Sequence, residues 1–371
     1  MKILYVTTIS NTVNAFLIPH IKMLTDQGHD VDVAFNIEQP VNKEIYDLGC
    51  KVFEIGFRRS PFDKRNLKAY KDLRKIIEDG RYELVHTHTP VASVCSRIAC
   101  MNLQGVKVFY TAHGFHFYKG APLKNWLIYY PIEKLLSKHT DVLIAINKED
   151  YEIACKKLHA KSTCLINGVG IDLKKFIPQT SALKTQMRNH YGFDNDEFIL
   201  FYAGELSYRK HQDLLIEAVC LLADSIPEIR LVLAGTGECE NQYKELANKL
   251  GIGEKVKFIG YRNDIANLML TADIAVSSSR QEGLPVNVME AMASGLPIVV
   301  TDCRGNRDLV QNGKNGYVVR LDDPKSFKDS IKKIYTLPGN GSKFSRNNLE
   351  IIDNYSIGKI TDEMKNLYEF S

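Results

Sequence analysis

Short apolar runs of strand character alternate with helical patterns along almost the whole of this 371-residue chain. Each run is rich in Ile, Leu, Val, Phe and Tyr, and amphipathic segments such as residues 16–27 lie between the runs. Strands and helices that alternate in this way form mainly parallel sheets with helices on both faces. The runs of the first half lie at residues 2–7, 30–35, 52–55, 84–87, 107–111, 142–145 and 163–166. The sequence therefore predicts an α/β fold built from Rossmann-like sheets.

The length of the chain predicts two domains. A chain of 371 residues, of which 44% are hydrophobic, is long enough to bury two ordinary cores. Polar sequence of poor periodicity follows Pro178 and continues to about Glu197, where a new strand-like run begins. We place the domain boundary near Pro178, which gives a first domain of residues 1–178 and a second of residues 179–355.

Charge and cysteine usage exclude several classes of protein. The formal charge of +4, from 48 basic and 44 acidic residues, is too balanced to indicate nucleic acid as a partner, and no nucleic-acid reading motif is present. The eight cysteines are scattered without a close pair, which argues against a zinc site or a disulfide framework and favours a reducing cytoplasm. No apolar run approaches the roughly 20 residues that span a bilayer. We expect a cytoplasmic protein that is soluble or peripheral to a membrane.

Residues 277–302 carry the clearest functional pattern. They read as a buried strand, a polar turn, a helix that opens at residues 284–285 and a second buried strand. The unpaired amides at a helix start attract anions, and the glycine before this helix lets a ligand approach the backbone. Glu282 and Glu290 lie on either side of this expected phosphate-binding position and can accept hydrogen bonds from hydroxyl groups next to it. A nucleoside diphosphate sugar has this layout.

The spacing of Glu282, seven residues and Glu290, followed by AMASGLPIV, resembles the donor-site signature of family 4 glycosyltransferases. The resemblance implies a retaining enzyme of the GT-B fold, with two Rossmann-like domains that face an interdomain cleft. Residues 166–178 are similar to the segment that joins the two domains in that family, and a C-terminal helix over residues 356–371 is expected to cross back onto the first domain. The alternative is that Glu282 is a solvated turn residue and Glu290 a surface helix residue.

Other positions match the catalytic residues of the family. Lys210 resembles the phosphate-binding lysine, and we assign the role of the usual arginine to Arg209 because Glu205 occupies its place. Cations here would neutralise a diphosphate leaving group, although they could also form a solvent-exposed helix cap. His113, which precedes Gly114 at a strand end, resembles the histidine that contacts the donor sugar. The implied catalytic residues are His113, Glu282, Arg209 and Lys210.

The resemblance also implies a set of donor-binding residues. Tyr261 and Arg262 stand at a strand end where family members hold the nucleobase, although a surface loop is an equal alternative. Asn306, Arg307 and Asp308 replace a glycine-rich segment that ends in glutamate, and they are candidates for sugar selection. The implied donor-binding residues are Gly283, Leu284, Pro285, Val286, Glu290, Tyr261, Arg262 and Gly235.

The first domain is expected to bind the acceptor. The loop TISNTVNA after the first strand faces the usual ligand crevice but lacks the glycine pair that family members carry there. Residues 57–75 and 118–138 mix lysine and arginine with aromatic residues, which suits an anionic membrane surface or a diphosphate-bearing lipid. A solvated helix face with core aromatics is the alternative. The candidate acceptor residues are Asn11, Asn14, His88 and His116.

The resemblance implies transfer of a hexose or N-acetylhexosamine from a nucleotide diphosphate sugar, with UDP as the expected nucleotide. The expected acceptor is a saccharide or a polyprenyl-diphosphate-linked saccharide, in capsular or exopolysaccharide synthesis at the inner face of the cell membrane. No metal and no cofactor are expected. The alternatives are a sugar-nucleotide epimerase of the same fold and a non-catalytic partner that binds nucleotide sugars.

Overall fold

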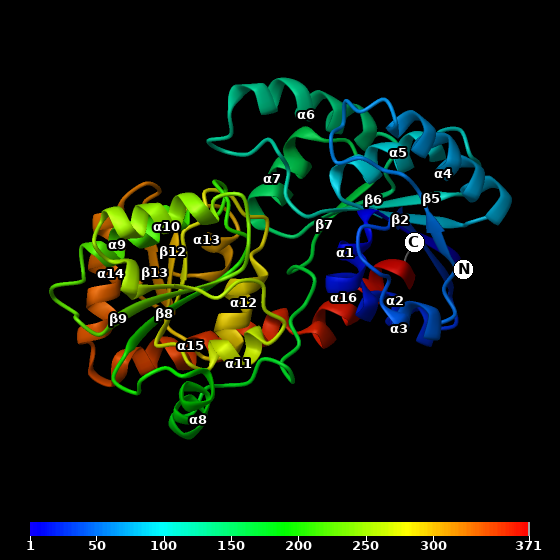
Figure 1. The fold of residues 1–371 in the computed structure, drawn as a ribbon. Coiled ribbons are helices and arrows are strands. Elements are labelled where there is room, and N and C mark those ends of the chain that lie inside the picture. The colour runs from blue at the N-terminus through cyan, green and yellow to red at the C-terminus, as the bar shows by residue number, and fades with distance from the viewer. Residues whose placement is uncertain (370–371) are drawn as a thin grey trace. The chain divides into compact units, whose positions relative to one another are not determined.

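The computed structural model describes residues 1–369, and the chain divides into two compact units (Figure 1). The first unit contains Met1–Gly170 together with the C-terminal segment from Ile357, and the second contains Ile171–Ser356. The boundary predicted near Pro178 lies inside the second unit. The amide of Ile171 donates a hydrogen bond to the carbonyl of Tyr355 at 2.9 Å, so the chain already pairs with the second unit at this point.

The first unit is built on a seven-stranded sheet with the order β3-β2-β1-β4-β5-β6-β7. Every strand pair in it is parallel, as the alternation of strands and helices predicts. The strands are β1 (Lys2–Ile9), β2 (Asp30–Asn36), β3 (Val52–Glu54), β4 (Leu84–His88), β5 (Lys107–Ala112), β6 (Val142–Ala145) and β7 (Ser162–Leu165). The helices are α1 (Ser10–Thr12), a π-helical turn (Val13–Leu17), α2 (Ile18–Asp26), α3 (Lys43–Asp47), α4 (Asn66–Gly80), α5 (Pro90–Cys100), α6 (Leu123–Ser137), α7 (Lys148–Lys157) and α16 (Ile357–Glu369).

Both faces of this sheet are covered because successive strand residues point to opposite sides. Ile3 and Tyr5 of β1 pack into one core with residues of α2 and α16. Leu4 and Val6 pack into a second core with α4 and α5. A continuous apolar run such as that of β1 is therefore what a strand buried on both faces requires.

The segment after β1 differs from the predicted loop. A helical segment begins at Ser10, although the sequence pattern placed the start of the helix at Phe16. The Ser10 hydroxyl donates to the carbonyl of Gln39 at 2.8 Å and accepts from the amide of Gln39 at 3.1 Å. These bonds tie the start of the helix to the loop that follows β2, a tertiary contact that local sequence does not reveal.

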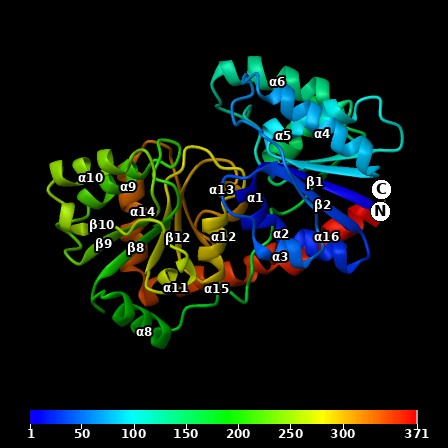
Figure 2. The same cartoon turned by 45° about the vertical axis from the view of Figure 1, so that its right-hand side comes forward.

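The C-terminal helix α16 returns to the first unit and packs beside α2, as predicted (Figure 2). Ile360, Met364 and Tyr368 form its buried face. The Tyr368 hydroxyl hydrogen-bonds to the hydroxyl of Tyr5 at 2.6 Å and to Nδ1 of His86, and all of these groups are buried. Residues 370 and 371 of the predicted helix lie outside the described residues.

The second unit is built on a six-stranded sheet with the order β10-β9-β8-β11-β12-β13, again parallel throughout. The strands are β8 (Phe198–Ala203), β9 (Ile229–Ala234), β10 (Val256–Phe258), β11 (Ile274–Ser277), β12 (Ile298–Thr301) and β13 (Gly316–Val319). The α-helices are α8 (Ser181–Tyr191), α9 (Gln212–Cys220), α10 (Glu240–Lys249), α11 (Ile265–Met269), α12 (Val286–Ala293), α13 (Asn306–Leu309), α14 (Pro324–Thr336) and α15 (Ser342–Ile352). Short 3₁₀ turns span Gly253–Lys255, Pro338–Gly341 and Asp353–Tyr355.

Both sheets reverse their winding at the first strand of the unit. β1 lies between β2 and β4, and β8 lies between β9 and β11. In open α/β sheets, ligands bind outside the carboxyl ends of the strands at such a reversal. The strand order therefore directs attention to the loops after β1 and β4 and to the loops after β8 and β11. No helix within residues 1–369 is both long enough and apolar enough to span a membrane.

The hydroxyl of Tyr368 is expected to contribute to the stability of the first unit. Tyr368→Phe leaves the buried Nδ1 of His86 and the buried hydroxyl of Tyr5 short of a partner, which lowers the free energy of unfolding by about 1–3 kcal/mol. Urea unfolding measures the change. Tyr46→Phe is the matched control, because Tyr46 is 54% exposed and should unfold like the wild type. Equal stability of the two variants would contradict the role assigned to the Tyr368 hydroxyl.

Candidate active site

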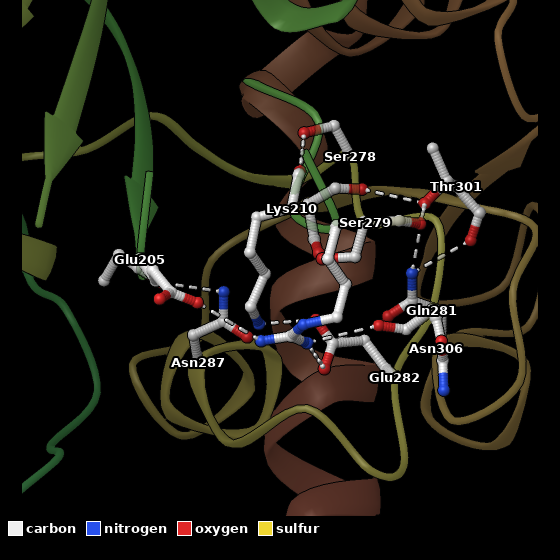
Figure 3. Close-up of polar contacts among 12 residues, drawn as sticks. Glu205, Lys210, Ser278, Ser279, Gln281, Glu282, Asn287, Thr301 and Asn306 are labelled. Atoms are coloured by element: carbon white, nitrogen blue, oxygen red, sulfur yellow. Dashed lines mark hydrogen bonds and ion pairs between the residues drawn. The ribbon is translucent and has the colours of Figure 1, made fainter. Parts of the chain in front are cut away.

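The loops after β8 and β11 are joined at the carboxyl edge of the second sheet (Figure 3). The Ser278 hydroxyl donates to the carbonyl of Lys210 at 2.8 Å, and the amide of Arg280 donates to the carbonyl of Arg209 at 2.9 Å. The side-chain amide of Asn287, on α12, donates to the carbonyl of Ala203 at 2.9 Å. These bonds hold the two loops in one arrangement.

A buried ion pair lies where these loops meet. Lys210 Nζ is 2.5 Å from Glu282 Oε1, and the two side chains are 13% and 8% exposed. Arg209 Nη1 lies 3.6 Å from Glu282 Oε2, while the Arg209 side chain is 47% exposed. Figure 3 shows Lys210 pointing toward the Glu282 carboxylate. The structure thus brings together three of the residues implied as catalytic.

The charges in this pair shift each other's pKa. Burial alone would raise the pKa of the Glu282 carboxyl, but the Lys210 ammonium and the Arg209 guanidinium lower it below its usual value. Burial alone would lower the pKa of Lys210, but the nearby Tyr202 and Glu282 side chains raise it. Both members of the pair therefore stay charged at neutral pH.

Glycines allow the loops at this edge to pack backbone against backbone. A Cβ atom on Gly305 would lie 2.3 Å from the carbonyl oxygen of Gly283, and one on Gly235 would lie 2.0 Å from that of Gly204. Both positions also have positive φ angles, +76° and +145°, which favour glycine. Gly235, implied to bind the donor, therefore has a packing role here.

The first helical residue of α12 is Val286, one position after Pro285. Pro285 is the N-cap residue, with φ −76° and ψ 115°, so it precedes the first turn in which the sequence pattern placed it. The first amide to bond back is that of Met289, which donates to the carbonyl of Pro285 at 3.2 Å. The amides of Val286, Asn287 and Val288 come before it and point out of the helix start. Anions are favoured at this position by these amides and by the helix dipole.

Glu290 lies on the second turn of α12 and is partly buried. Burial raises the pKa of its carboxyl to about 7, against a smaller opposite effect of the Lys175 ammonium. The side chain therefore changes its charge close to neutral pH. Glu282 and Glu290 differ in this respect, since only Glu282 has cations in direct contact.

The end of β12 supplies Thr301 and Arg304, which sequence reasoning missed, beside Asn306, which it named. The buried Arg304 donates through Nε to the carbonyl of Glu282 at 2.8 Å, and the Thr301 hydroxyl donates to the carbonyl of Ser279 at 2.6 Å. Asn306 donates to the carbonyl of Thr301 at 2.9 Å, while its Oδ1 is buried and finds no hydrogen-bond partner within residues 1–369. The signal that could have pointed to Arg304 is a basic residue three positions after the end of a buried strand.

Arg307 and Asp308 stand apart from this group. Arg307 pairs with Asp302 at 2.9 Å on the exposed side of the loop, with the Arg307 side chain 43% exposed. The carbonyl of Asp308 accepts a hydrogen bond from the Tyr355 hydroxyl at 3.5 Å. Of the three residues that follow β12 and were named as candidates for sugar selection, Asn306 is the one buried among the loops of the ion pair.

Tyr261 and Arg262 follow β10. Tyr261 is 72% exposed, and Arg262 forms an ion pair with Asp264, in which Nε lies 2.8 Å from Oδ1. The charge of Arg262 is therefore compensated within its own loop. An exposed aromatic ring at a strand end is available to stack on a planar ligand.

His113 is partly buried and belongs to a row of histidine rings in the first unit, in which His86 and His88 are buried. Its Nε2 lies 3.0 Å from Nδ1 of His88, and the ring of His88 lies 4.3 Å from that of His86. Burial, together with the neighbouring His20, lowers the pKa of His113 to about 4. Burial also lowers the pKa of His88 and His86. The row is therefore neutral at physiological pH, and each ring has one N–H donor and one acceptor.

The candidate acceptor residues have separate surroundings. His88 lies inside the histidine row, whereas His116 stacks on Tyr129 of α6 with ring centroids 4.4 Å apart. The side chain of Asn14 donates to the carbonyl of Pro40 at 2.9 Å and accepts from the amide of Asn42 at 3.0 Å. Asn14 thus anchors a loop of its own unit. The side-chain oxygen of Asn11 lies 3.4 Å from the Ser10 hydroxyl.

Within residues 1–369, no group of three or more His, Cys, Asp or Glu side chains is placed to hold a metal ion. The site in the second unit contains the cations of Lys210, Arg209 and Arg304 and the carboxyl groups of Glu282 and Glu290. Such a set can bind a diphosphate through cations and helix-start amides, and can bind hydroxyl groups through carboxylates.

Comparisons with known proteins agree with this chemistry. Residues 184–350 match the family of glycosyl transferases group 1, and residues 2–147 match the glycosyl transferase 4-like family. The putative glycosyltransferase EpsD of Bacillus subtilis is 41% identical over 99% of this chain and 96% of its own length. An Escherichia coli UDP-Gal:alpha-D-GlcNAc-diphosphoundecaprenol alpha-1,3-galactosyltransferase is 31% identical over 94% of this chain and 90% of its own length. The crystal structure of Anabaena Alr3699/HepE with UDP superposes with a TM-score of 0.83 at 19% identity, covering all of both chains, which identifies the fold as GT-B. The chain belongs to the family 4-like glycosyltransferases.

Proposed function

We propose that this protein is a retaining, metal-independent transferase that moves a hexose or N-acetylhexosamine from a UDP-sugar to a polyprenyl-diphosphate-linked saccharide. The observation that carries the proposal is the buried Lys210–Glu282 pair at the winding reversal of the second sheet, beside the start of α12. No cofactor is part of the proposed reaction.

In this proposal the diphosphate of the donor binds to the amides at the start of α12 and to Lys210 and Arg209. These groups are fixed before the substrate arrives, because backbone hydrogen bonds join the two loops. Fixed positive charge in a buried site stabilises the negative charge that develops on the leaving diphosphate. In other enzymes that act on phosphates, a metal ion supplies this positive charge.

The two glutamates are proposed to hold the sugars on either side of the diphosphate. Glu282, which stays ionised, accepts hydrogen bonds from the transferred sugar, and Glu290 accepts them from the ribose. Tyr261 is proposed to stack on the uracil. His113, from the first unit, is proposed to contact the donor sugar through its neutral ring, as the family resemblance implies.

The names of relatives support the choice of substrates. The Escherichia coli relative acts with UDP-Gal on a diphosphoundecaprenol-linked acceptor. A Campylobacter jejuni N,N'-diacetylbacillosaminyl-diphospho-undecaprenol alpha-1,3-N-acetylgalactosaminyltransferase is 28% identical over 89% of this chain. A UDP-sugar donor and an acceptor on a polyprenyl diphosphate are therefore the substrates that we propose. Synthesis of a capsular or secreted polysaccharide is the proposed setting.

A membrane-embedded acceptor requires the enzyme to reach a lipid surface. Along α6, Leu123, Leu127 and Leu135 are 73%, 68% and 60% exposed, and they lie at helical spacing on one stripe. Lys124 and Lys138 are also exposed on or next to this helix. An apolar stripe flanked by cations suits the interface of an anionic membrane. We propose that this helix rests on the cytoplasmic face of the cell membrane.

The transfer reaction is tested with purified protein, a panel of UDP-hexoses and UDP-N-acetylhexosamines, and polyprenyl-diphosphate-linked saccharides. We expect UDP release that depends on both substrates, and product NMR should show that the anomeric configuration of the donor is kept. Lys210→Ala and Glu282→Gln are each expected to lower turnover by about 10²–10³-fold. The first removes a cation that stabilises the charge developing on the leaving diphosphate, and the second removes the charge of the carboxylate beside that cation. Lys244→Ala, on the surface of the same unit, should retain activity.

Other outcomes would identify the alternatives. Conversion of the nucleotide sugar into an epimer without acceptor would indicate an epimerase. Full activity of both Lys210→Ala and Glu282→Gln would show that this site is catalytically silent.

UDP affinity is expected to depend on the charge of Glu290. Ribose hydroxyls donate to the ionised carboxylate, whose pKa in the free protein is about 7, so binding must favour loss of the proton. The part of the UDP affinity that requires ionised Glu290 is therefore about tenfold lower at pH 6 than at pH 8. Calorimetric titration of UDP at several pH values measures this dependence.

Glu290→Gln is the control for this pH dependence, because the phosphates of UDP ionise identically with both proteins. The variant should bind UDP more weakly at pH 8, and the ratio of the two affinities should shrink as the pH falls to 6. A constant ratio across that range would show that Glu290 does not change its charge on binding.

Membrane contact through α6 is tested by flotation with vesicles of neutral phosphatidylcholine and with vesicles that also contain anionic phosphatidylglycerol. We expect the wild type to float with the anionic vesicles, and Leu127→Glu to stay in solution because a charge replaces an exposed apolar side chain. Leu321→Glu, at a 39% exposed apolar position of the second unit, is the control and should float normally. Equally weak flotation of the wild type with both vesicles would refute the membrane contact.

A further inference from the structure

The first unit contains an apolar cavity of about 280 Å³ at the carboxyl edge of its sheet. It lies next to the loops that follow β1 and β4 and is closed by α5 and α6. Its apolar walls include Ile9, Pro90, Val94, Phe115, Phe117 and Ile132. The cavity is separate from the ion pair of Lys210 and Glu282, because all of its lining residues belong to the first unit.

Several polar groups in its walls already have partners inside the protein. The hydroxyls of Thr8 and Thr89 hydrogen-bond to each other at 2.7 Å. Glu133 forms an ion pair with the fully buried Arg97 at 2.8 Å, and the guanidinium of Arg97 lies over the ring of Tyr110. A sugar ring would need several unpaired donors and acceptors for its hydroxyls. The walls favour an apolar occupant, since an apolar group loses no hydrogen bond there.

The volume limits how much of a ligand can enter. Cavities that enclose a whole small ligand span roughly 300–1,000 Å³, and this cavity of about 280 Å³ lies just below that range. It fits one end or one segment of a longer apolar molecule. The rest of such a molecule has to continue outside.

The mouth of the cavity provides for such a continuation. Ile132 lines the cavity and is 37% exposed on α6, one turn from the exposed Leu135. On another side, Pro61 lines the cavity next to Phe62, which is 72% exposed. An apolar chain that leaves the cavity would therefore pass over apolar surface rather than directly into water.

Cations stand at the same mouth. Arg59 lines the cavity, and Arg58 and Lys64 are exposed on the same loop. Arg59 is 70% exposed and pairs with Glu38 at 2.8 Å, a surface contact that contributes little and can be exchanged for another anion. Phosphate groups attached to the apolar chain would thus meet positive charge where the chain enters.

We infer that this cavity holds the phosphate-proximal isoprene units of a polyprenyl diphosphate, with the diphosphate at Arg58 and Arg59. The inference rests on the proposed function, which supplies the polyprenyl acceptor, and it adds a site for the lipid part of that substrate. Recognition of the lipid here would place the sugar end of the acceptor outside the cavity, at the carboxyl edge of the sheet.

The test uses farnesyl diphosphate, a short water-soluble isoprenoid, and needs neither a membrane nor a donor. Trp126 is the only tryptophan, and its ring packs on the cavity residue Phe117 with centroids 5.5 Å apart, so its fluorescence reports on the cavity. We expect saturable quenching by farnesyl diphosphate. Inorganic diphosphate and palmitoyl lysophosphatidate, which supply the anion alone and a straight acyl chain, should bind about tenfold more weakly or not at all.

Val94→Phe fills the cavity and is expected to weaken farnesyl diphosphate binding by about tenfold or more. Ile98→Phe adds the same group on the exposed side of the same helix, outside the lining, and should bind like the wild type. Equal affinity of both variants, or equal binding of palmitoyl lysophosphatidate by the wild type, would overturn the inference.

A second pair of variants covers the case in which Val94→Phe does not fold. Ile132→Glu places a charge at the partly exposed wall and should abolish farnesyl diphosphate binding, whereas Leu127→Glu, outside the lining, should retain it. Retained binding in Ile132→Glu would contradict the site.

UDP binding is measured separately on every variant. Absence of UDP binding by the wild type would refute the proposed donor without bearing on the lipid site. Absence of farnesyl diphosphate binding would refute the lipid site and would leave UDP binding unchanged.

Discussion

The winding reversal in each sheet is the constraint on which the rest of this structure depends. Parallel strands need crossover helices, and two neighbouring strands whose crossovers run to opposite sides leave a crevice between their following loops. In the second unit these strands are β8 and β11, and in the first they are β1 and β4. The ion pair of one unit and the apolar cavity of the other both lie at these positions.

In the second unit the crevice is held by buried charge. An ammonium and a carboxylate taken out of water are strongly destabilising unless they compensate each other, and Lys210 and Glu282 do so at direct contact. The loops that carry them are fixed by backbone bonds and by glycines at which no side chain would fit. The site is therefore rigid before a ligand binds, which is the condition under which fixed charges stabilise a reacting group most effectively.

The first unit uses the same position in a different way. Several of its polar side chains have partners within the unit, in the row of neutral histidines, in the Thr8–Thr89 contact and in the Arg97–Glu133 pair. What remains open is apolar and continues onto the exposed stripe of α6. The two units thus have the same strand order but opposite chemistry: one suits an anionic, hydroxyl-rich ligand and the other an apolar chain.

The sequence alone determined the parallel sheets and the family, because these depend on local periodicity and on residues close together in the chain, such as Glu282 and Glu290. The return of the C-terminal helix to the first unit was expected from the family resemblance and not from periodicity. The sequence did not reveal the helical start at Ser10 or the internal role of Asn14, since both depend on contacts with a loop some 26 to 29 residues away. Nor did it reveal Arg304 or the cavity. Tertiary structure alone decided these, because a buried partner or an empty volume is created by segments that are distant in sequence and meet only when the sheet has formed.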